Sequence, residues 1–159
     1  MTYRELLSLI KNLDDEIDLT LLIKDKIKKA YIYLTGHEDK KILIEGDFCY
    51  EVSEKMSGEF TFDEAQENIE TLLGKDWRLP SKDELNLIYN TLKVAGQIQD
   101  EDWYWSSSLT SNKSRYAWDQ NFSDGYQNYT LKEMYCSVRA IRSFKILSLQ
   151  DVLLLKDSK

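Results

Sequence analysis

The sequence predicts an α+β protein, and three observations lead to that class. Capping boxes, in which Ser or Thr precedes Glu by three residues, begin helically spaced apolar runs at Thr2, Thr61 and Ser81. Short segments rich in β-branched and aromatic residues, separated by glycine turns, fill much of the rest. A chain of 159 residues usually forms one domain with a small appended element.

The first thirty residues are predicted to form an N-terminal helical segment. Thr2 and Glu5 make its capping box. Apolar residues follow at spacings of three and four, namely Leu6, Leu9, Ile10, Leu13 and Ile17. The stretch from Leu19 to Ile27 continues this spacing, although its β-branched content leaves a strand open as an alternative.

Residues 31–147 are predicted to form the main domain, which begins with an antiparallel meander. Its strands are Tyr31–Leu34, Lys41–Glu45 and Phe48–Val52, separated by Thr35-Gly36 and Gly46-Asp47. Residues 148–159 are assigned to a short C-terminal helix and tail, because Ser148 and Asp151 fit a helix start.

Two capped helices are predicted in the middle of the chain. The first begins with the Thr61 and Glu64 capping box and stops at Gly74, a typical C-terminal cap. Its predicted buried face holds Ala65, Ile69, Leu72 and Leu73. The second begins with the Ser81 and Glu84 capping box, directly after Pro80. Its apolar residues are Leu85, Ile88 and Leu92.

The remainder is predicted to be strands. They are Tyr104–Ser108, Arg115–Phe122, Tyr126–Thr130 and Met134–Arg142, with a turn at Ser123-Asp124-Gly125. In the last of them, Cys136, Val138 and Ala140 alternate with Tyr135, Ser137, Arg139 and Ile141, as in a half-buried strand.

The charge and the apolar pattern exclude several classes of protein. A net charge of −7 argues against a nucleic-acid partner, because phosphate binding needs clustered Lys and Arg. No apolar run is long enough for a membrane span, and the acidic amphipathic start is unlike a secretory leader. As written, the chain is expected in the cytoplasm; a place on a phage particle or a cell surface would need another route of export.

The two cysteines point to burial rather than to chemistry. Cys49 and Cys136 are far apart and lack CxxC spacing, so they form neither a zinc half-site nor a redox motif. Two buried free thiols are expected.

Five motifs occur in a fixed order between Gly58 and Phe144, and together they resemble one known family. They are Gly74-Lys-Asp-Trp-Arg-Leu-Pro80, Ser81-Lys-Asp-Glu-Leu85, Tyr104-Trp-Ser-Ser-Ser108, Ala117-Trp118 with Asn121-Phe-Ser-Asp-Gly125, and Val138-Arg-Ala-Ile-Arg142. We call this set the signature. It resembles the Lcl C-terminal domain family, found in collagen-like bacterial adhesins. The resemblance implies a C-type-lectin-like fold with two helices and twisted antiparallel sheets, preceded here by the N-terminal helical extension.

The same scaffold serves formylglycine-generating enzymes and the variable proteins of diversity-generating retroelements, so the resemblance implies no single ligand. Lectins that bind sugar through calcium resemble one another in a Glu-Pro-Asn or Gln-Pro-Asp loop followed by Trp-Asn-Asp. This chain has Trp118-Asp119-Gln120-Asn121 instead, so we expect no metal and no cofactor. The acidic run Asp100-Glu101-Asp102 is interpreted as a solvated face.

No catalytic set is visible in the sequence, and we expect no enzyme activity. Ser106, Ser107 and Ser108 would need a base, and the only histidine, His37, lies in a different region. Five large signature residues are predicted to pack in the core, namely Trp77, Leu79, Trp105, Trp118 and Phe122. Arg78 is predicted to pair with Glu84 or to cap backbone carbonyls, and Arg139 and Arg142 are predicted to have structural roles.

A set of aromatic, amide and carboxylate side chains on predicted loops and strand ends is the candidate ligand-binding site. It comprises Trp103, Tyr104, Tyr116, Asp119, Asn121, Tyr126, Asn128 and Tyr129. Strand alternation puts Tyr126 and Asn128 on the face opposite Tyr129, so the whole set cannot contact one ligand. The leading hypothesis is a non-catalytic binding module for a protein or carbohydrate partner. The alternative is an acidic cytosolic inhibitor or immunity-type protein that captures a basic protein.

Overall fold

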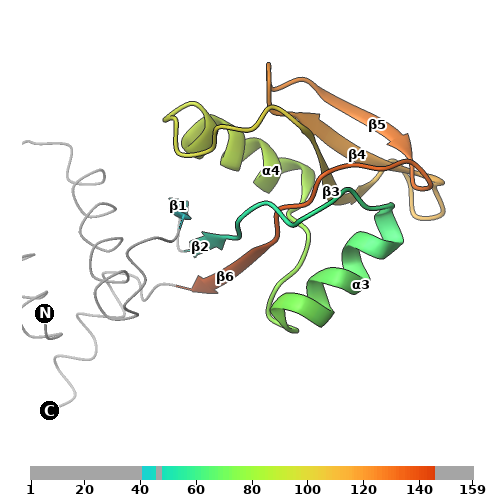
Figure 1. Ribbon diagram of the computed structural model, residues 1–159, viewed down its shortest axis with the longest axis horizontal. Helices are drawn as coiled ribbons and strands as arrows, with labels where there is room; N and C mark the ends of the chain where they lie inside the picture. The colour runs from blue at the N-terminus through green and yellow to red at the C-terminus, as the bar shows by residue number, and fades with distance from the viewer. Residues whose placement is uncertain (1–40, 46–47, 146–159) are drawn as a thin grey trace, which may run out of the picture.

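The computed structural model describes residues 41–45 and 48–145, so the predicted N-terminal helices, the Tyr31–Leu34 strand and the closing helix lie outside the described residues. The strands are β1 (Lys41–Glu45), β2 (Phe48–Val52), β3 (Trp103–Leu109), β4 (Tyr116–Asn121), β5 (Gln127–Leu131) and β6 (Ile141–Lys145). The helical elements are α3 (Phe62–Leu73), α4 (Lys82–Ile88) and the π-helix η1 (Tyr89–Lys93). Figure 1 shows their arrangement. The α+β class predicted from the sequence is confirmed for this part of the chain.

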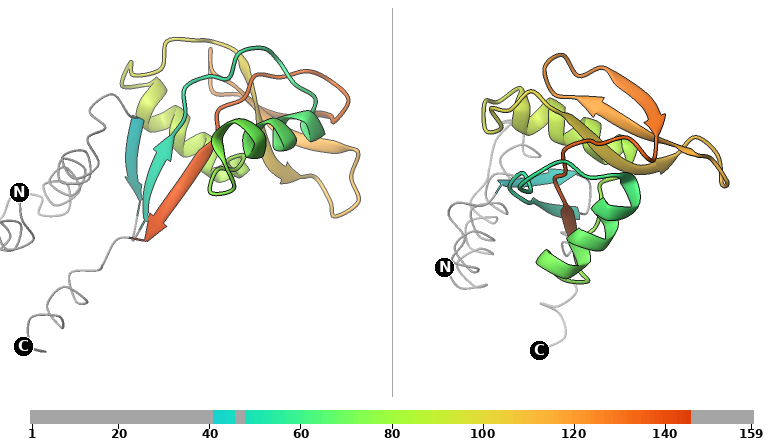
Figure 2. Two further views of the ribbon diagram at one scale, coloured as in Figure 1. Left: turned by 60° about the horizontal axis from the view of Figure 1, so that its bottom comes forward. Right: turned by 45° about the vertical axis from the view of Figure 1, so that its right-hand side comes forward.

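The strands form two antiparallel sheets of three strands each. One sheet has the order β1-β2-β6, and it joins the start of the described region to its end. These three strands lie side by side in the left view of Figure 2. The other sheet has the order β3-β4-β5, so β5 is an edge strand. All of the predicted site residues lie on or beside this second sheet.

Helix α3 begins as its capping box predicts. The Thr61 side chain accepts from the Glu64 backbone N–H, and the Glu64 carboxylate accepts from the Thr61 N–H. Ala65 and Ile69 are buried as expected. The prediction that Leu72 and Leu73 are also buried is wrong, because both leucines in the last turn are exposed. The repeat of apolar residues along α3 therefore extends one turn beyond the part of the helix that packs against the core.

Helix α4 also begins with the predicted capping box, made by Ser81 and Glu84. The Arg78 guanidinium donates two hydrogen bonds of 2.7 Å to the Glu84 carboxylate, which confirms the predicted pair. Burial raises the pKa of Glu84, but the hydrogen bonds from Arg78 and Ser81 lower it overall. The pair thus ties the loop that precedes α4 to its first turn.

The prediction of one strand over Met134–Arg142 is wrong. Only its end belongs to β6, and the preceding residues make isolated bridges, Phe60 with Cys136 and Tyr104 with Ser137. Both alternating sets are buried in this segment from Cys136 to Ile141. The segment passes between packed elements, so its polar residues are enclosed together with its apolar ones.

Two hydrophobic clusters pack on opposite faces of the β3-β4-β5 sheet. One contains Trp105 of β3 with Phe62 and Ile69 of α3. The other contains Tyr104 of β3 with Leu85 of α4 and residues of the smaller sheet. Because Tyr104 and Trp105 are consecutive, their side chains point to opposite faces. The sheet therefore lies between α3 on one face and α4 on the other, as Figure 1 shows.

The signature residues mainly hold this arrangement together. Leu79, Trp105 and Phe122 are fully buried, which confirms that part of the core prediction. Trp77 and Trp118 are only partly buried, so their predicted place in the core is only partly right. Cys49 and Cys136 are both buried, as expected.

Candidate functional site

The predicted site residues divide between the two faces of the β3-β4-β5 sheet. In the register of β4 and β5, Asp119 is opposite Asn128, and Trp118 is opposite Tyr129. Consecutive strand residues face opposite ways, so Asp119 with Asn128 and Trp118 with Tyr129 belong to different faces. The structure thus brings together two smaller groups rather than one set of eight.

The first group is an aromatic row on the α4 face. Tyr129 packs edge-on against Trp118, with ring centroids 5.5 Å apart, and against Tyr116 at 5.9 Å. Lys82 Nζ of α4 lies 3.3 Å from the centre of the Trp118 ring on the same face. Tyr116 and Tyr129 remain 42% and 52% exposed. The row is held in place by ring contacts while it presents apolar area to solvent.

The second group surrounds a hollow of about 360 Å³ on the opposite face, and we call it the acidic hollow. Three predicted site residues line it, namely Trp103, Asp119 and Asn128. The other lining residues are Glu59, Glu101, Asp102, Thr130, Met134, Tyr135 and Cys136. Tyr126 adjoins this group, because its ring packs edge-on against Trp103 with centroids 6.4 Å apart. Tyr126 is also 61% exposed.

Asp119 is the most unusual member of the acidic hollow. Its side chain is 4% exposed, and its Oδ1 atom has no hydrogen-bond partner among the described residues. Its other oxygen, Oδ2, accepts only a weak hydrogen bond from the Cys136 thiol, with Sγ 3.9 Å away. A buried carboxylate without a partner is unfavourable, since ionisation there has to replace lost hydration.

The ionisation of both groups reflects this environment. Burial raises the pKa of the Asp119 carboxyl to about 6. Burial, with the negative charge of Asp119 beside it, raises the pKa of the Cys136 thiol to about 12. At neutral pH the hollow therefore holds an ionised carboxylate and a protonated thiol that is unsuited to nucleophilic chemistry.

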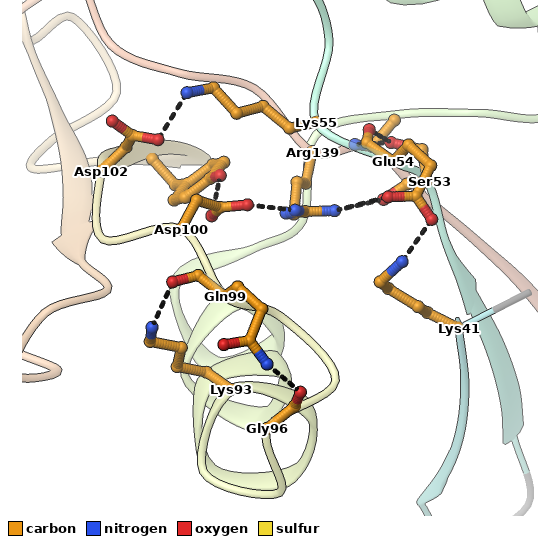
Figure 3. A network of polar contacts seen from close by, with 12 residues as sticks. Lys41, Ser53, Glu54, Lys55, Lys93, Gly96, Gln99, Asp100, Asp102 and Arg139 are labelled. Carbon is orange, nitrogen blue, oxygen red and sulfur yellow. Dashed lines mark hydrogen bonds and ion pairs between the residues drawn. The ribbon is translucent and has the colours of Figure 1, made fainter.

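A polar network fixes the loop that carries the acidic rim of the hollow (Figure 3). Arg139 Nη2 donates to Asp100 Oδ2 at 2.5 Å, and its Nη1 donates to the Ser53 carbonyl at 3.0 Å. Lys55 Nζ pairs with Asp102. Burial raises the pKa of Asp100, yet hydrogen bonds from Tyr104 and Arg139 lower it overall. The 100–102 loop is thus anchored on both sides of Glu101.

Two predicted site residues have structural places instead. Tyr104 is fully buried between α4 and the smaller sheet, and its hydroxyl donates to Asp100. Asn121 Oδ1 accepts from the Ser123 N–H and shapes the turn between β4 and β5. In that turn Gly125 has φ +80°, a conformation that favours glycine. The prediction that Tyr104 contacts a ligand is wrong because no part of its side chain reaches the surface.

Sequence reasoning finds Asp119 but misses Glu59, Glu101, Asp102 and the Cys136 thiol, which also line the hollow. The run at Asp100-Glu101-Asp102 is visible in the sequence, but its pattern is typical of a solvated face. Glu59 and Cys136 belong to segments that meet through the bridge between Phe60 and Cys136 and through neighbouring backbone hydrogen bonds such as that from Met56 to Val138. No spacing of residues within either segment predicts that the two segments lie side by side.

The three consecutive serines of β3 make hydrogen bonds with backbone groups. Ser106 donates to the Trp118 carbonyl, Ser107 donates to the Pro80 carbonyl, and Ser108 accepts from the Lys82 N–H. Within residues 41–45 and 48–145, no three His, Cys, Asp or Glu side chains cluster as a metal site would require. Of the helices in the same part of the chain, none has the length and apolarity to cross a membrane.

The fold and site thus define a small α+β domain with an aromatic row and an acidic hollow on one sheet. Residues 47–142 match the sequence model of the Lcl C-terminal domain, and the chain belongs to that family. The predicted family membership is therefore confirmed.

The crystal structure of botrocetin is similar at a TM-score of 0.39 and 10% identity, covering 65% of this chain and 95% of botrocetin. No curated protein sequence matches the chain.

Proposed function

We propose that this chain is a non-catalytic binding module that recognises a protein or carbohydrate partner through β4, β5 and the adjoining end of β3. The scaffold is then the C-type-lectin-like one that the signature implies. The observation that carries the proposal is the display of Tyr116, Tyr126 and Tyr129. All three are more than two-fifths exposed, and each is held by an edge-on contact with another aromatic ring.

Aromatic side chains in fixed positions suit recognition for a physical reason. They bring a large contact area, and little conformational entropy remains to be lost on binding. Exposed apolar area of this kind is unfavourable in water unless a partner covers it. The acidic hollow, which Tyr126 adjoins on the face opposite Tyr116 and Tyr129, supports the second candidate, an inhibitor-type protein that captures a basic partner.

The test is partner capture followed by calorimetry. A partner is recovered from host lysate with the full chain and identified by mass spectrometry. Tyr116→Ala and Tyr126→Ala should each weaken its binding by roughly 1–3 kcal/mol. Leu72→Ala is the control, because Leu72 is an exposed apolar residue on α3, at 66% against 61% for Tyr126 and 42% for Tyr116. Equal losses in all three variants, or a loss only in Leu72→Ala, would place the binding surface elsewhere.

A further inference from the structure

We propose that the acidic hollow beside Asp119 binds the side-chain ammonium group of a lysine on a protein partner. The inference deepens the proposed function, on which it rests, by naming the chemical group that the module recognises. It starts from the unpartnered, buried Oδ1 atom of Asp119, a residue that lines a surface hollow. An ionised oxygen in this position gains most from a cation that enters from outside the chain.

The walls of the hollow suit a flexible apolar stem with a charged end. Trp103, Met134 and Tyr135 supply apolar and aromatic surface to the hollow that Asp119 also lines. A lysine stem packs well along such surface while its ammonium group reaches the carboxylate. The Trp103 ring adds a favourable face for a cation. A volume of about 360 Å³ is at the small end of ligand sites, which fits one side chain rather than a large ligand.

The charges around the hollow act in the same direction. Glu59, Glu101 and Asp102 line it together with Asp119. Lys55 is paired with Asp102 at the rim, and it compensates only one of these carboxylates. A concave site lined by one sign of charge attracts the opposite charge and raises its local concentration.

The geometry favours lysine over arginine and over a metal ion. Cys136 donates to Asp119 Oδ2, and Oδ1 is the carboxylate oxygen that lacks a partner among the described residues. A guanidinium fork binds best to two oxygens at once, whereas an ammonium group is a point charge that needs one. A hard metal ion needs several oxygens around one point, and the described residues hold no such cluster.

The site should also depend on pH. A proton competes with the ammonium group for Asp119, whose pKa burial raises to about 6. The Cys136 thiol, with its pKa raised to about 12, stays protonated throughout this range. The other charged groups around the hollow are Glu59, Glu101, Asp102 and Lys55. We expect affinity to be about tenfold lower at pH 5 than at pH 7.5.

The experiment is an NMR titration of the full-length ¹⁵N-labelled chain with N-acetyl-lysine N′-methylamide. The Trp103 indole and the Asp119 amide should shift with this probe more strongly than with the neutral norleucine analogue. Asp119→Asn should lower the affinity at pH 7.5 by about tenfold or more and remove the pH dependence. Asp83→Asn is the matched control, because it removes the same charge from an exposed position on α4. It should leave the affinity unchanged.

Several outcomes would overturn the assignment. They are equal shifts with the norleucine analogue, stronger binding of the arginine analogue or of glucosamine, and saturable calcium binding at the same resonances. Unchanged binding by a folded Asp119→Asn variant, or no shift at all, would also overturn it. A chain that still captures its partner through Tyr116 and Tyr126 would then leave the proposed function standing. If the chain binds the lysine probe but substitution of those tyrosines has no effect on partner capture, the lysine site stands and the proposed function is overturned.

Discussion

Asp119 and Gln120 are neighbours on β4 and both are buried, yet their side chains differ in hydrogen bonding. Gln120 Nε2 donates to Asn86 Oδ1 and to the Gly125 carbonyl, each at 3.0 Å, and its Oε1 accepts from Gln127 at 3.5 Å. Asp119 Oδ1 has no partner within the described part of the chain. The two residues face opposite sides of one sheet, so strand alternation separates a satisfied polar group from an unsatisfied one.

This difference in hydrogen bonding means that Gln120 stabilises the fold, whereas Asp119 makes folding less favourable. A buried polar group with all its hydrogen bonds contributes to stability, and its removal leaves its partners buried without hydrogen bonds. A buried carboxylate with one oxygen unpartnered and the other only weakly hydrogen-bonded makes folding less favourable, so its presence favours another role. Substitutions of Asp119 and of Gln120 should therefore change stability with opposite signs.

The largest effect is expected at Trp105, which lies opposite Asp119 in the register with β4. Its ring packs edge-on against Phe62 at 5.8 Å, and its indole N–H donates to the Phe60 carbonyl at 2.7 Å. Trp105→Ala should lower the free energy of unfolding by about 3–5 kcal/mol through cavity formation and the stranded carbonyl. Urea unfolding measures this loss. A wild-type midpoint would show that Trp105 contributes nothing to the core.

A smaller loss is expected for Gln120→Ala. The change strands the Asn86 oxygen and the Gly125 carbonyl at the junction of α4 with the β4–β5 turn. It should lower the free energy of unfolding by roughly 2–3 kcal/mol. The control is Gln127→Ala, because Gln127 makes its hydrogen bonds nearby but is less buried. Equal losses in the two variants would mean that burial does not decide the contribution.

The sequence predicted the scaffold far better than the site. Capping boxes at Thr61 and Ser81 are local patterns, and both fixed a helix start correctly. Strand alternation correctly separated Asn128 from Tyr129, because it too is local. The burial of Tyr104 and the unpartnered state of Asp119 depend on segments far apart in the sequence. Neither could be read from spacing alone.

The smallest effect, and the one of opposite sign, is expected for Asp119→Asn. Burial raises the folded pKa of Asp119 to about 6, whereas an unfolded aspartate titrates near about 3.9. The folded state therefore holds this proton more tightly. As the pH rises from about 4 to above 6, wild-type folding must accept an ionised buried carboxylate, so stability from this group is lost.

The Asn variant has no such group, so it should match the wild type near pH 4 and exceed it above pH 6.5. The expected difference is on the order of 2 kcal/mol. Asp100 and Glu84, whose pKa values are lowered, lose their contribution as the pH falls, in both proteins alike. The difference between the two unfolding curves therefore isolates Asp119. A variant that is less stable than the wild type at every pH would show that Asp119 stabilises the fold as Gln120 does. The contrast between these two residues of β4 would then be lost.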